Sequence, residues 1–121
     1  MHVYIKQTVT VCLSICLCLS CTSRRMEHVA LQQAGYLMEE HPDSAFSLLK
    51  SLSSLVGMTS EDKAEYALLL AEAADKNGYS LLPCDSLLNF ALHLYDENAK
   101  EHAIALLYKG KVQQERTMPM L

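Results

Sequence analysis

Cysteine is the residue type best placed to do chemistry in this sequence, because four of the five cysteines fall within residues 12–21. Thiolates at short spacing can bind zinc, close a disulfide or accept an acyl chain. The spacing C-x3-C-x-C-x2-C lies in an apolar stretch, and no group of His or Cys follows downstream to complete a zinc site. We therefore interpret Cys12, Cys16 and Cys18 as small apolar residues, which leaves Cys21 as the cysteine of interest.

The segment before Cys21 has the layout of a secretory signal peptide. Lys6 and the free amino group supply positive charge, and residues 9–20 then run without a charged side chain. Twelve such residues make a helix about 18 Å long, which is shorter than the roughly 30 Å hydrocarbon core of a membrane. We expect residues 1–20 to be a cleaved signal peptide rather than a transmembrane helix.

The residues around Cys21 resemble the lipobox of bacterial lipoproteins. Ser20 is the small residue before the cysteine, Thr22 and Ser23 are polar residues after it, and Cys18 stands where the family usually has Leu. The resemblance implies that Cys21 is acylated and becomes the first mature residue, with residues 21–25 as a linker. It also implies a lipid-anchored protein of the bacterial cell envelope, in the outer membrane or on the periplasmic face of the inner membrane. An ordinary secretory cleavage and an uncleaved anchor are the alternatives.

Histidines are the next candidates for chemistry, and those after Cys21 lie far apart in the sequence: His28, His41, His93 and His102. No HExxH motif is present. His93 can share a helix face with Asp96 or Glu97, but we interpret that group as a solvated helix end. The histidine spacing therefore predicts no metal site.

Cys84 and the acidic residues offer little more. Cys84 falls near an expected helix N-terminus, which can lower the pKa of a thiol, but no downstream relay of His and Asn gives it a protease pattern. We interpret it as a residue at a helix cap. The acidic group of Glu39, Glu40 and Asp43 is typical of a charged loop. We expect no catalytic residue and no cofactor, and hence no enzyme.

Apolar residues recur at helical spacing after residue 25, and no alternating strand pattern competes. Five helices are expected: the first from Met26 to Glu40, the second from Pro42 to Gly57, the third from Ser60 to Asn77–Gly78, the fourth from Pro83 to Tyr95 and the fifth from Asn98 to about Arg116. Thr59 with Asp62, and Asn98 with Glu101, match the spacing of a capping box. The expected apolar faces of the five helices, in chain order, are these: Met26, Ala30, Ala34 and Leu37; Ala45, Leu48, Leu49 and Leu52; Ala64, Ala67, Leu68, Ala71 and Ala74; Leu87, Leu88, Ala91 and Tyr95; and Ala103, Ile104, Leu107 and Val112.

The expected helices also resemble one another. DSAFSLLKSL aligns with DSLLNFALHL at an offset of 42, and VALQQAGYL aligns with YALLLAEAA at an offset of 37. Such self-similarity is typical of stacked helical hairpins, because no single hairpin can bury its own apolar face. The sequence predicts an all-α domain over residues 26–116, built from stacked antiparallel hairpins, with a short tail over 117–121.

Three stretches resemble the tetratricopeptide-like lipoproteins of Gram-negative bacteria: EEHPDSAFSLLKSL, EDKAEYALLLAEAADKNGYSLLPCDSLLNFALHLYDEN and KEHAIALLYKGKV. The likeness covers nearly the whole chain. Leu31, Ala34, Gly35 and Met38 fit the family's first-helix pattern loosely, while Glu72 replaces its glycine in the middle copy. The resemblance implies a helical-repeat fold that binds another protein.

Charge and aromatic residues limit the class of partner. The net charge of −4 and the scattered Lys and Arg residues argue against a nucleic-acid partner. Four tyrosines either pack between hairpins or face a bound protein segment: Tyr36, Tyr66, Tyr95 and Tyr108. We expect membrane lipid, through acylated Cys21, and a protein or peptide to be the partners.

Apolar residues are expected all around the fifth helix, and no sixth helix is expected to cover its outer side; these residues are Ile104, Leu106, Leu107, Tyr108 and Val112. Stacked repeats need a polar terminal helix. The chain is therefore expected either to self-associate through this helix or to be a shortened form of longer relatives. The leading hypothesis is a lipid-anchored adaptor of the cell envelope. The alternative is a shortened input module of a longer helical-repeat sensory or transcriptional regulator.

Overall fold

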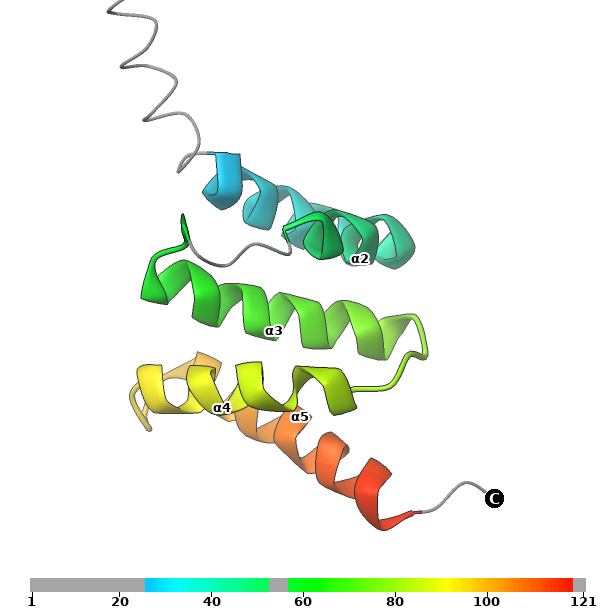
Figure 1. Ribbon diagram of the computed structural model, residues 1–121, viewed down its shortest axis with the longest axis vertical. Helices are drawn as coiled ribbons and strands as arrows, with labels where there is room; N and C mark the ends of the chain where they lie inside the picture. The colour runs from blue at the N-terminus through cyan, green and yellow to red at the C-terminus, as the bar shows by residue number, and fades with distance from the viewer. Residues whose placement is uncertain (1–25, 53–56, 119–121) are drawn as a thin grey trace, which may run out of the picture.

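The computed structural model describes residues 26–52 and 57–118, and most of these residues are helical (Figure 1). The first helix spans residues 26–37. It is followed by α2 (Pro42–Ser51), α3 (Ser60–Lys76), the short 3-10 helix η2 (Leu82–Cys84), α4 (Asp85–Leu94) and α5 (Lys100–Thr117). No strand occurs in these two ranges, which confirms the all-α expectation.

The helices form a stack of antiparallel neighbours with α3 at its centre. In Figure 1 the first helix and α2 lie on one side of α3, while α4 and α5 lie on the other. The contacts agree, because α3 packs against α2, α4 and α5, and α4 packs against α5. This is the hairpin arrangement that the internal similarity predicts.

Local sequence signals set three helix ends as expected. Pro42 occupies the first turn of α2, where a missing N–H costs nothing. The Thr59 hydroxyl oxygen accepts a hydrogen bond from the Asp62 backbone N–H at 3.1 Å and so caps α3. Gly78, with φ of +72°, ends the following turn in the left-handed conformation that glycine adopts without strain.

Several helix ends differ from expectation. The first helix ends at residue 37 rather than at Glu40, and α4 begins at Asp85 because Pro83 belongs to the preceding 3-10 helix. α2 ends at Ser51 rather than at Gly57, because the Ser51 hydroxyl donates to the Leu48 carbonyl at 2.5 Å and the Leu52 N–H donates to Leu49, which tightens the last turn. α5 begins at Lys100 after an N-cap at Ala99 that has no side-chain hydrogen bond, so Asn98 is not the cap. Ala99 N–H instead donates to the Asp96 carbonyl in a turn that directs the chain into α5.

The core is centred on a row of small residues along α3, all of them buried: Ala64, Ala67, Ala71, Ala73 and Ala74. Small side chains let neighbouring helices approach closely. Leu49 from α2 and Leu88 from α4 are fully buried on either side. The expected faces of α2, α3 and α4 are therefore confirmed.

The faces of the two outermost helices need correction. Met26 is 65% exposed, and the buried residues of the first helix and the turn after it are Leu31, Ala34 and Met38. α5 buries Ala105, Tyr108 and Val112, whereas Ala103 and Leu107 are exposed and Ile104 is partly buried. Both helices contact the stack on one side only, so an apolar residue in the sequence need not lie on the contacting side.

Polar side chains fasten α5 to the turn between α3 and α4. The Asp85 carboxylate accepts hydrogen bonds from the ammonium of Lys109 and from Arg116 Nη2, the latter at 2.8 Å. Lys111 Nζ lies 2.6 Å from Asp75 Oδ2. Glu115 accepts from the Leu81 backbone N–H at 2.9 Å and from the Ser80 hydroxyl at 2.7 Å. These contacts select the side of α5 that faces the stack.

Replacing Asp85 by asparagine is expected to destabilise the fold by about 0.5–1.5 kcal/mol near neutral pH, since the two ion pairs and the charge at the start of α4 are lost. Hydrogen bonds from Lys109 and Arg116 hold the pKa of Asp85 below its ordinary value. Its stabilisation is therefore present above about pH 4 and is lost as the pH falls through the lowered folded-state pKa. Urea unfolding at pH 7 and at pH 2.5 measures this difference.

Asp43→Asn is the matched control, because Asp43 also lies in the first turn of a helix but is exposed and pairs with no cation among the described residues. We expect a smaller loss, of about 0.5 kcal/mol or less. Equal losses in the two variants, or a loss at Asp85 that persists unchanged at pH 2.5, would contradict the assignment.

The proposed signal peptide, the linker and Cys21 lie outside the described residues. Within the part of the chain that the structure does describe, no helix combines the length and the apolar character needed to cross a membrane. The lipid anchor therefore stays a prediction.

Candidate protein-binding groove

Two hollows adjoin along one side of α3. The first has a volume of about 300 Å³ and lies between the first helix and α3; its lining is Leu31, Gln32, Gly35, Tyr36, Glu65 and Leu69. The second has a volume of about 380 Å³ and extends to α5; its lining is Glu65, Leu68, Leu69, Glu72, Tyr95, Glu101 and Ile104. Because Glu65 and Leu69 line both, the two hollows are neighbours and together make one indented surface beside α3. We call it the α3 groove.

The groove combines an apolar floor with acidic edges. Leu68, Leu69 and Ile104 supply apolar surface, and three carboxylates stand along the second hollow: Glu65, Glu72 and Glu101. None of the described residues that line either hollow is Lys or Arg. The groove is therefore suited to a ligand that brings both apolar surface and positive charge.

Burial and nearby carboxylates raise the pKa values of two tyrosines, of which Tyr95 lines the groove. Burial raises the pKa of Tyr95, and the carboxylates of Glu65 and Glu101 raise it further. Burial, with Glu72 and Asp75, raises the pKa of Tyr108 to about 12. Both phenols stay neutral at physiological pH and act as hydrogen-bonding groups.

The structure separates the residues that the sequence grouped as a partner surface. Tyr36, which is 87% exposed, lines the first hollow, and Tyr95 and Ile104 line the second. Tyr66 and Tyr108 lie in the core, which is the packing alternative for these two tyrosines and not the partner-facing one. Leu107 is exposed on α5 but lines neither hollow. Self-association through α5 stays a prediction.

Cys84 is not an activated thiol. It lies at the N-cap of α4 without a side-chain hydrogen bond to the helix, and it is buried. Burial raises the pKa of the Cys84 thiol, and this outweighs the opposing effect of Lys50. Cys84 occupies the helix-cap position that the sequence predicts, and its pKa is raised because removal from water disfavours the thiolate.

A third hollow, of about 440 Å³, lies between α5 and the turn after α3. Its charged lining residues are already paired: Asp75 with Lys111, and Glu115 with Ser80 and Leu81. A ligand there would have to displace contacts that hold α5 in place. The α3 groove is the better candidate, since its carboxylates have no such partners among the described residues.

No family model, no curated protein and no solved structure matches this chain.

Sequence reasoning missed most of the groove. Glu65, Leu68, Leu69 and Glu72 follow one another at positions i, i+3, i+4 and i+7 of α3, the spacing of a single helix face. This face was hard to recognise in the sequence because α3 is apolar over most of its circumference, and the alanine row was the stronger pattern. Two glutamates seven residues apart within an otherwise apolar run were the available signal.

Proposed function

We propose that the protein is a membrane-anchored, non-catalytic adaptor of the bacterial cell envelope that binds another protein in the α3 groove. The supporting observation is that two neighbouring hollows share Glu65 and Leu69, and that carboxylates but no Lys or Arg line them. The proposed anchor is an acyl group on Cys21, in line with the resemblance to tetratricopeptide-like lipoproteins.

The chemistry of the groove defines the partner. An extended or helical segment carrying Lys or Arg can pair with Glu72 and Glu101 while it places an apolar side chain against Leu69 and Ile104. Tyr36 at the rim offers a large contact surface and a free hydroxyl. A nucleic acid would be repelled by the same carboxylates.

The proposal is tested by photo-crosslinking in membranes of the cells that produce the protein. A photoreactive amino acid at Tyr36 or Ile104 is expected to capture the same partner, whereas one at exposed Leu106 should not. Glu72→Lys combined with Glu101→Lys should reduce the yield about tenfold or more, which corresponds to about 1.4 kcal/mol of lost attraction.

The matched control is Glu61→Lys combined with Glu97→Lys, which makes the same change in net charge at two exposed residues that line neither hollow. Its crosslinking yield should be close to that of the parent, and a lysine-rich peptide should compete with the partner while a glutamate-rich one should not. Equal capture from Leu106, or equal effects of the two double variants, would overturn the proposal.

A further inference from the structure

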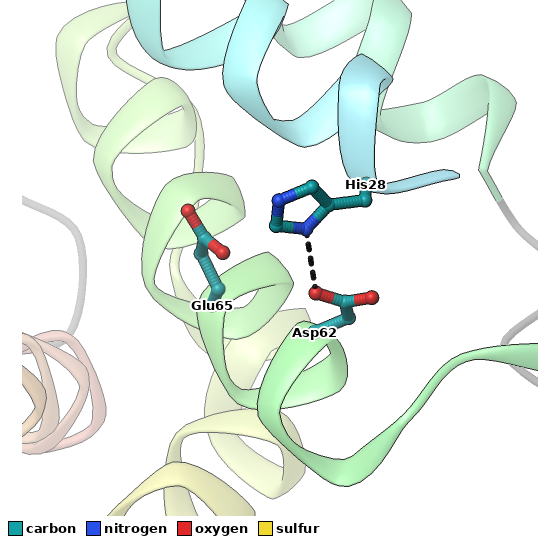
Figure 2. A group of neighbouring side chains, drawn as sticks. All are labelled: His28, Asp62 and Glu65. Atoms are coloured by element: carbon teal, nitrogen blue, oxygen red, sulfur yellow. Dashed lines mark hydrogen bonds and ion pairs between the residues drawn. The ribbon is translucent and has the colours of Figure 1, made fainter. Parts of the chain in front are cut away.

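Three potential metal ligands meet where the first helix crosses α3. Figure 2 shows His28 from the first helix facing Asp62 and Glu65 of α3. His28 Nδ1 lies 3.1 Å from Asp62 Oδ1, and one ligand atom from each of the three residues lies within 4.8 Å of the others. Asp62 and Glu65 are three positions apart, so they share a face of α3. The group cannot be recognised from the sequence, because His28 is 34 residues from Asp62.

The distances fit a small tetrahedral ion after modest side-chain movement. Metal–ligand bonds of about 2.0–2.1 Å place tetrahedral ligand atoms about 3.3 Å apart. The His28–Asp62 separation is already close to that value. Glu65 has to approach by at most about 1.5 Å from the 4.8 Å limit, which rotation about its side-chain bonds can supply.

The charge balance of the group also favours a cation. Two carboxylates stand one helical turn apart, and neither forms an ion pair with Lys or Arg among the described residues. The neighbouring Lys63 is directed elsewhere, since its ammonium lies 4.3 Å from the centroid of the Phe90 ring. A divalent ion would offset the repulsion between the two carboxylates.

Gln32 is placed to orient the imidazole. Its side-chain amide lies one turn along the first helix, with its nitrogen 3.4 Å from His28 Nε2. When Nδ1 binds a metal, Nε2 carries the proton and needs an acceptor. Rotation of the Gln32 amide by half a turn presents its oxygen, which would fix the imidazole for ligation.

We propose that His28, Asp62 and Glu65 bind a divalent transition-metal ion of the zinc class, with water as the fourth ligand. One imidazole and two carboxylates suit zinc or cobalt, whereas calcium and magnesium require more oxygen ligands. The ion joins the first helix to α3 at the edge of the α3 groove. Its binding requires no partner protein.

The test uses the full chain with serine at Cys12, Cys16, Cys18 and Cys21, so that these thiols cannot bind zinc. Equilibrium dialysis with zinc chloride is expected to show one bound equivalent. His28→Ala and Glu65→Gln should each weaken binding about tenfold or more. His93→Ala and Glu61→Gln are matched controls on exposed residues outside the group, and they should leave the affinity unchanged.

Two further measurements make the result specific. Zinc should raise the melting temperature of the parent by about 4 °C or more and leave that of His28→Ala unchanged. Cobalt should give the visible absorption of a tetrahedral nitrogen and oxygen site in the parent, and magnesium should not compete. Circular dichroism of each variant verifies that the helices are intact. No zinc uptake at 100 μM, or uptake that survives His28→Ala, would overturn the proposal.

Discussion

Leu88→Ala is expected to lower the free energy of unfolding by about 2–5 kcal/mol. Leu88 has no exposed surface and lies on α4, which packs against both α3 and α5. Truncation removes buried apolar surface and leaves a cavity that helices on both sides cannot easily fill. Because small domains are stable by only about 5–15 kcal/mol, the loss should be visible as a large shift of the urea midpoint.

The matched control for this prediction is Leu106→Ala. It makes the same leucine-to-alanine change on α5, but at a side chain that is 54% exposed. We expect a change within about 0.5 kcal/mol, as is usual for a surface substitution. Similar losses at Leu88 and Leu106 would mean that the outer side of α5 is covered in solution, which the expected self-association would explain.

Ala71→Leu should destabilise the protein by about 1–3 kcal/mol, although leucine has a similar helix propensity and is more hydrophobic. Ala71 is fully buried in the middle of α3, the helix that contacts α2, α4 and α5. Three additional carbon atoms have no room between helices that approach over alanine, so the neighbours must move apart. Thermal unfolding by circular dichroism measures the effect.

Ala103→Leu makes the same substitution at an exposed position of α5 and should be nearly neutral. The pair distinguishes crowding from helix propensity, because both positions lie within α-helices. If Ala71→Leu were neutral or stabilising, close approach of the helices along the alanine row would be the wrong account of the core.

The sequence predicted the positions of the helices more reliably than it predicted which side of the first helix and of α5 packs against the stack. Thr59 and Gly78 mark helix ends through local bonds and backbone conformation, so their roles are readable from spacing alone. The inner helices have neighbours on more than one side, and their apolar faces were found correctly. On α5 the Tyr108 side, and not the Leu107 side, packs against the stack because of contacts with residues distant in the sequence. Lys109 pairs with Asp85, and Lys111 pairs with Asp75. Glu115 accepts hydrogen bonds from Ser80 and Leu81.

By itself the sequence determined that the described chain is helical, where most helices begin and end, and that neighbouring helices pair. These properties follow from hydrogen bonds within a few residues and from the need of each apolar stripe to be covered. Only the tertiary structure decided that Tyr66 and Tyr108 are buried while Tyr36 and Tyr95 line a groove, and that His28 meets Asp62 and Glu65. The physical reason is that these placements depend on how helices cross, and crossing brings together side chains whose separation in sequence carries no signal.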